Sequence, residues 1–112
     1  MNNHWRMNSM NREQTARRNH NSGYSCAGAV YSAFTDVAKG SAPIPRSEGG
    51  KCGAVLAAEK VLRQLRLDSV AFDQQFVRQF GSLKCDELRR ARHSCNDLVG
   101  TAARLAEEAR QR

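Results

Sequence analysis

The chain has 112 residues and carries 18 Lys and Arg against 11 Asp and Glu, a formal net charge of +7. It is long enough for one domain with a modest core, and no stretch approaches the roughly 20 apolar residues that span a membrane. The N-terminus lacks the apolar segment of a secretory signal peptide, so we predict a cytoplasmic protein. With two prolines and no alternating apolar pattern, the sequence predicts an all-α fold.

The first half of the chain predicts a tail, two helices and a loop. Residues 1–10 are polar and rich in Asn, which predicts a flexible tail ahead of a single helical, cysteine-containing domain over 11–112. A short helix is expected over about residues 11–20. The next begins at Cys26 behind the N-cap residue Ser25, and its apolar face recurs at helical spacing as far as Val37. Residues 40–50 then predict a Pro/Gly loop before the third helix.

The second half predicts further helices, giving a small bundle of four to six. The third begins near Cys52, and Asp68 or Ser69 caps a fourth that ends at Gly81. The stretch from Cys85 to the C-terminus reads either as one continuous helix or as two helices broken near His93. One helix would separate Cys85 and Cys95 by about 15 Å. We favour the break, because Ser94 and Asp97 have the spacing of a helix start.

Four isolated cysteines, Cys26, Cys52, Cys85 and Cys95, each lie at a predicted helix start. The first N–H groups of a helix are unpaired and favour negative charge, so they stabilise a thiolate. Lys51 and Lys84 precede two of these cysteines, and positive neighbours act in the same direction. If the helix starts converge, the four thiols form one site; if they do not, the cysteines are separate.

The cysteines and their flanking residues resemble the C-GCAxxG-C-C family of redox-active proteins. The resemblance rests on Gly23-Tyr24-Ser25-Cys26-Ala27, on Cys52-Gly53-Ala54, on Phe80-Gly81-Ser82 with Cys85, and on Cys95 with Leu98-Val99. It covers about residues 16–109, and Ala57 stands where the family pattern has glycine. The resemblance implies a small helical protein with a redox role for the four cysteines.

Our first functional hypothesis is thiol–disulfide chemistry with a redox protein or a small thiol or disulfide as partner. Cys52 is the predicted attacking thiol, because Lys51 is adjacent and Gly53 leaves room for a substrate. Tyr24 is a candidate supporting residue near Cys26. Whether the protein is an enzyme, and its oligomeric state, stay open.

Two alternatives remain. Four thiolates could bind zinc or an iron–sulfur cluster for electron transfer, although no close Cys pair of the kind typical of zinc sites occurs.

The second alternative is a basic interaction module with structural cysteines. Nucleic acid is disfavoured as its partner because no stacking aromatic series accompanies the cations. The three histidines lack metal-ligand spacing and are predicted to lie at the surface. The module's cations would be Arg89, Arg90, Arg92 and Arg104.

Overall fold

The computed structural model describes residues 11–38 and 49–111, and within these ranges the chain forms six helices. In chain order they are α2 (Arg12–Asn21), α3 (Cys26–Ser32), α4 (Gly53–Gln64), α5 (Val70–Phe80), α6 (Cys85–Arg90) and α7 (Cys95–Gln111). The predicted all-α fold is confirmed. The predicted tail and most of the predicted Pro/Gly loop lie outside the described residues. None of the described helices combines the length and the apolar character that crossing a membrane requires.

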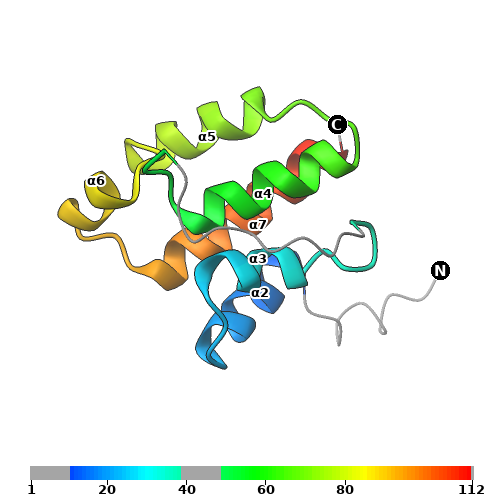
Figure 1. Ribbon diagram of the computed structural model, residues 1–112, viewed down its shortest axis with the longest axis horizontal. Coiled ribbons are helices and arrows are strands. Elements are labelled where there is room, and N and C mark those ends of the chain that lie inside the picture. The colour runs from blue at the N-terminus through cyan, green and yellow to red at the C-terminus, as the bar shows by residue number, and fades with distance from the viewer. Residues whose placement is uncertain (1–10, 39–48, 112) are drawn as a thin grey trace.

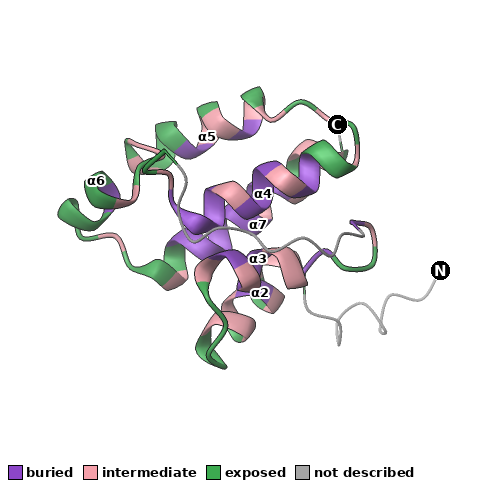
Figure 2. Ribbon diagram, in the orientation of Figure 1, coloured by how far each residue is buried: buried purple, intermediate pink, exposed green. Residues whose placement is uncertain are grey.

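Helix α7 is the centre of the fold, because it packs against α2, α3, α4 and α5. Figure 1 shows α5 on one side of the α4–α7 pair, α2 and α3 on the other, and α6 at the edge of the molecule. Buried residues concentrate on α4 and α7 (Figure 2), where alanines let the two helices approach closely. The largest fully buried side chains are Phe34, Phe72, Phe76, Leu62 and Leu88.

Local signals set several helix ends. Ser25 Oγ accepts a hydrogen bond of 3.0 Å from the Gly28 N–H and so caps α3. Ser94 Oγ accepts one of 3.0 Å from the Asp97 N–H directly before α7. The predicted break near His93 is therefore confirmed. Gly81 ends α5 with a φ of 90°, a left-handed conformation that favours glycine.

Helix α3 is shorter than the apolar pattern predicts, since it ends at Ser32 rather than near Val37. The reason is a contact from α2. The Arg12 guanidinium lies 4.6 Å from the centroid of the buried Phe34 ring and donates a hydrogen bond of 2.8 Å to the Ala33 carbonyl. A continuing helix would use that carbonyl to accept from the Val37 N–H. Arg12 takes its place, and residues 33–37 form turns instead.

The side chain of Arg17 lies across Gly100 and joins α2 to the start of α7. A Cβ at position 100 would sit 2.6 Å from Arg17 Cζ, so only glycine leaves room for this path. The Arg17 guanidinium donates to Asn96 Oδ1 at 3.0 Å and to Asp97 Oδ1 at 2.9 Å. The first turn of α7 is therefore fixed against α2, directly beside Cys95.

A buried polar cluster joins the start of α4 to α5. Lys51 Nζ donates to both carboxylate oxygens of the buried Glu59, at 3.3 and 3.1 Å. Burial, a hydrogen bond with Glu59 and the charge of Glu59 raise the pKa of Asp73 to about 7. Asp73 is therefore the carboxyl of this cluster whose proton is held to higher pH. Asp73 Oδ1 is buried without a hydrogen-bond partner.

This cluster makes part of the folding free energy depend on pH. The pKa of Asp73 rises from 3.8 unfolded to about 7 folded, so its protonated form favours the folded state at low pH. That contribution is lost as pH rises from about 4 to 7. We predict that Asp73→Asn, which keeps a donor for Glu59, is about 1–2 kcal/mol more stable than the parent at pH 8. Thermal melting at pH 5 and pH 8 measures the difference.

The exposed Asp86 on α6 offers the matched control, since Asp86→Asn makes the same change in charge. Its melting profile should stay parallel to that of the parent across this range. A parallel profile for Asp73→Asn as well would show that Asp73 does not carry the proton.

Candidate functional site

The four cysteines occupy the helix starts that the sequence predicts. Cys26, Cys85 and Cys95 are the first residues of α3, α6 and α7, and Cys52 is the N-cap residue of α4. All four thiols are free.

A short backbone bridge places two of these starts side by side. Lys51 and Lys84 form an isolated antiparallel bridge. Around it, the Cys52 N–H donates to the Leu83 carbonyl at 2.9 Å, and the Cys85 N–H donates to the Gly50 carbonyl at 2.8 Å. The start of α6 is therefore held against the start of α4, although α6 is only six residues long.

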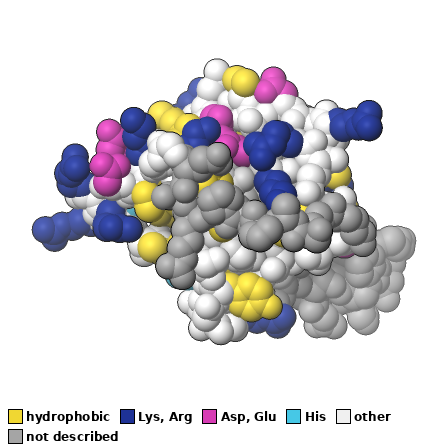
Figure 3. Space-filling view, viewed as in Figure 1, with side chains coloured by type: hydrophobic (Ala, Val, Ile, Leu, Met, Phe, Trp, Pro, Cys, Tyr) yellow, Lys and Arg dark blue, Asp and Glu magenta, His cyan; other side chains and the backbone are white. Residues whose placement is uncertain are grey.

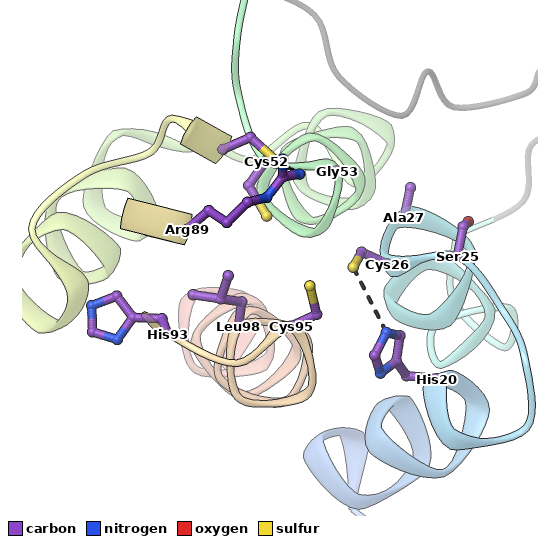
Figure 4. Close-up of a pocket in the computed structure, with 11 residues that line it drawn as sticks. His20, Ser25, Cys26, Ala27, Cys52, Gly53, Arg89, His93, Cys95 and Leu98 are labelled. Carbon is purple, nitrogen blue, oxygen red and sulfur yellow. Dashed lines mark hydrogen bonds between the residues drawn. The ribbon is translucent and has the colours of Figure 1, made fainter. Parts of the chain in front are cut away.

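All four cysteines line one cavity of about 380 Å³ (Figure 4). The convergence of the thiols, which the sequence leaves open, is therefore observed. Figure 4 shows Cys26 and Cys95 directing their sulfur atoms into the space between α3 and α7. The described residues that line it are His20, Ser25, Cys26, Ala27, Cys52, Gly53, Cys85, Arg89, His93, Cys95 and Leu98.

Exposure differs strongly among the thiols. Cys95 is exposed, Cys26 and Cys85 are partly buried, and Cys52 is only 3% exposed. Burial raises the pKa of the Cys52 thiol, and the backbone N–H groups of Ala54 and Val55 act against the rise. Desolvation therefore outweighs the effect of the helix start on this thiol, and the role of Cys52 as the attacking thiol stays a prediction.

Cys26 shows the same balance more strongly. Burial raises the pKa of its thiol to about 12, and the neighbouring cysteines contribute to the rise. Among these cysteines, Cys95 has the largest effect on Cys26. Both thiols line the same cavity.

A histidine and an asparagine lie behind Cys26. His20 Nε2 is 3.9 Å from Cys26 Sγ, and Asn96 Nδ2 is 3.4 Å from His20 Nδ1. Arg17 determines which way the Asn96 amide points: its guanidinium donates to Asn96 Oδ1, and its carbonyl accepts from Asn96 Nδ2 at 3.3 Å. A guanidinium cannot accept and a carbonyl cannot donate, so the amide has one allowed orientation.

That orientation turns the Asn96 Nδ2 group toward three acceptors: Asn21 Oδ1 at 3.1 Å, the Arg17 carbonyl at 3.3 Å and His20 Nδ1 at 3.4 Å. The Nδ1 side of the His20 ring therefore faces Asn96, and the Nε2 side faces Cys26 Sγ. A proton on Nε2 would be placed to donate to a thiolate at Cys26. The sequence predicted His20 to be an ordinary surface residue; its role depends on a contact between residues 76 positions apart, which no local pattern reveals.

The three predicted supporting residues differ in whether they line the cavity. Gly53 lines the cavity beside Cys52. The ammonium of Lys51 is bound by Glu59, 3.1 Å away, and Lys51 is not among the lining residues. Tyr24 is 49% exposed and does not line the cavity either. Only Gly53 therefore belongs to this site.

The alternative metal or iron–sulfur centre needs several ligands around one point. Within residues 11–38 and 49–111, no group of three His, Cys, Asp or Glu side chains is placed to hold a metal ion. The four-thiolate centre thus gains no geometric support here and stays a prediction from the sequence.

The cations of the predicted basic module do not act alike. Arg104 is bound by Glu108 at 3.1 Å and by Glu13 at 3.6 Å. Arg89, Arg90 and Arg92 remain exposed at α6. Of these four arginines, only Arg89 is among the described residues that line the cysteine cavity.

Comparison with known proteins adds no relative: no family model, no curated protein and no solved structure matches this chain. The resemblance to the C-GCAxxG-C-C family therefore stays a prediction.

The exposure and pKa differences predict an order of thiol reactivity. With iodoacetamide at pH 7, we expect Cys95 to be alkylated first and Cys52 last. Cys26 should accelerate with rising pH because its pKa is raised to about 12. Timed quenching followed by peptide mass spectrometry gives the four rates.

Denaturant provides the control, since unfolding should make the four rates nearly equal. If Cys52 in the folded protein reacts as fast as Cys95, the assigned burial of the cavity is wrong.

Proposed function

We propose that this protein is a thiol–disulfide redox protein in which Cys95 attacks a substrate disulfide and Cys26 resolves the mixed disulfide. The observation that carries the proposal is the pairing of an exposed thiol with a half-buried one inside a single cavity. This division of roles is the one that two-cysteine exchange requires.

Accessibility supports Cys95 as the attacking thiol. Cys95 is exposed and begins a helix of 17 residues. Cys52, which the sequence favours for this role, is 3% exposed. A substrate disulfide must approach the attacking sulfur in line with its own S–S bond, so a sealed thiol is a poor first nucleophile.

The raised pKa of Cys26 suits the second step. At neutral pH its thiol stays protonated and does not compete for the substrate, because only the thiolate attacks. Once deprotonated, a thiol of high pKa is a strong nucleophile. Cys26 therefore reacts only in the second step, after a mixed disulfide has formed on Cys95.

The exchange balances in two steps. The Cys95 thiolate attacks one sulfur of R–S–S–R′, forming the Cys95–S–S–R bond and releasing R′–S⁻, which takes the proton that Cys95 lost. Cys26 then attacks Cys95 Sγ, the Cys26–Cys95 bond forms, and R–S⁻ departs with the proton that Cys26 lost. Two protein thiols are oxidised to one disulfide, and the substrate disulfide is reduced to two thiols.

In this proposal His20 assists the second step. Its Nε2 lies 3.9 Å from Cys26 Sγ, and a proton there would donate to the negative charge that develops as Cys26 loses its own proton. Asn96 acts as a positioning residue, since its Nδ2 lies 3.4 Å from the opposite ring nitrogen, Nδ1.

Cysteine variants separate the assigned roles. We predict that Cys95→Ser lowers the rate of disulfide reduction at least about 100-fold, because the attacking sulfur is removed. Cys26→Ser should instead accumulate a stable adduct of the substrate on Cys95, visible by intact mass. Cys85→Ser is the matched control and should keep most of the activity.

If Cys52→Ser abolishes the reaction while Cys95→Ser does not, the roles follow the sequence-based hypothesis and our assignment is wrong. Circular dichroism of each variant separates loss of chemistry from loss of fold.

The role of His20 has its own signature. We predict that His20→Ala lowers the alkylation rate of Cys26 at pH 8 by roughly 3- to 10-fold, the value of one ordinary hydrogen bond, because the contact of 3.9 Å is long. Asn96→Ala should have a smaller effect in the same direction. Cys85 in the same sample is the internal control, and an equal fall at both cysteines would point to a general change of structure.

A further inference from the structure

The cavity has a charge bias that suggests what enters it. Among the residues that the structure describes, its lining includes Arg89 and two histidines and no Asp or Glu. The remaining lining residues are cysteines or small and apolar side chains such as Ala27 and Leu98, apart from Ser25. A ligand that enters therefore meets positive or neutral groups and no carboxylate.

The acids closest in sequence to the cavity are occupied by other partners. Asp97 is bound by Arg17 at 2.9 Å, and Asp86 lies 3.8 Å from Arg90. Glu87 accepts a hydrogen bond from Ser82 Oγ. None of them pairs with Arg89, whose contact in the described part of the chain is with Cys85 Sγ, at 3.9 Å. The Arg89 guanidinium is thus available to a ligand.

The position of Arg89 supports this use. Figure 4 shows its side chain extending toward the start of α4, next to Cys52 and Gly53. Figure 3 shows Lys and Arg side chains projecting at the edge of the molecule where α6 lies. Exposed basic residues there, including Arg90 and Arg92, extend the positive surface beyond the cavity. A positive surface at the mouth of a cleft draws anions toward it.

The volume indicates the size of the ligand. About 380 Å³ is at the lower end of the range for small-molecule sites. All four cysteines line it, and Cys95 is the exposed one. A small disulfide fits a space of this size beside Cys95, whereas a folded protein could present only an exposed disulfide there.

We propose that the substrate is a small-molecule disulfide that carries carboxylate groups, with Arg89 binding a carboxylate while Cys95 attacks the S–S bond. This inference rests on the proposed function. The reacting thiols are those of Cys95 and Cys26, and their two electrons and two protons convert one small disulfide into two small thiols. A carboxylate on the substrate suits Arg89 because a guanidinium can donate two parallel hydrogen bonds to it.

Three disulfides with arms of two carbons test the charge preference: dithiodipropionate is anionic, bis(2-hydroxyethyl) disulfide is neutral and cystamine is cationic. Pre-reduced protein is mixed with each under single-turnover conditions, and the released thiol is followed over time. Each rate is divided by the rate of dithiothreitol with the same disulfide, which removes differences in intrinsic reactivity. We expect dithiodipropionate to react roughly 3- to 10-fold faster than the neutral disulfide, with cystamine slowest, and the preference to shrink with salt.

Arg89→Gln should remove most of the preference for dithiodipropionate over the neutral disulfide, measured as the ratio of the two normalised rates. Arg63→Gln is the matched control, since it makes the same change in charge at an exposed site about three turns along α4 from Cys52. Its preference should match that of the parent.

The outcomes separate the two proposals. Equal normalised rates for the three disulfides, or a preference for cystamine, would overturn the substrate class and leave the redox function standing. A folded protein disulfide, such as that of insulin, reacting faster than all three would overturn it in favour of a protein partner. No reaction with any disulfide would overturn the proposed function itself.

Discussion

The contact between Arg17 and Gly100 is the constraint on which the arrangement of the site depends. Because position 100 has no side chain, Arg17 can pass over α7 and reach Asn96 and Asp97 in its first turn. The same contact fixes the Asn96 amide, which holds His20 beside Cys26. The start of α7, and Cys95 with it, is thereby held against α2 and α3. The contact between Arg17 and Gly100 thus helps to position Cys95 and the His20 ring beside Cys26.

The chemistry of the cavity follows from competition between burial and helix starts. The peptide N–H groups of Ala54 and Val55 favour the Cys52 thiolate, yet burial dominates and raises the pKa of this thiol. For Cys26 the neighbouring cysteines add to the same effect. The buried and half-buried thiols therefore favour their protonated forms, while Cys95 is exposed to solvent.

Much of the fold could be predicted from the sequence because local signals determine it. Ser25, Gly81 and Ser94 set helix ends through contacts within a few residues. The end of α3 could not be predicted, since it depends on Arg12, which lies 21 residues before the Ala33 carbonyl that it binds.

The site divides in the same way. The placement of each cysteine at a helix start was predictable, and so was the break before α7; whether the four starts converge was left open by the sequence and is seen only in the shared cavity. The burial of Cys52 was not, because it depends on which helices pack around it. Adjacency in sequence does not show where a charge lies: Lys51 directly precedes Cys52, but its ammonium is bound by Glu59. His20 and Asn96 could be found only from the folded chain.

The central claim is that Cys95 and Cys26 form the exchanging pair. Its most direct test is to oxidise the folded protein with one equivalent of a mild oxidant, block the remaining thiols and map the disulfide by peptide mass spectrometry. The account predicts a single intramolecular bridge between Cys26 and Cys95, with Cys52 and Cys85 recovered as blocked thiols. A bridge between Cys52 and Cys85, or a random mixture of pairs, would contradict it.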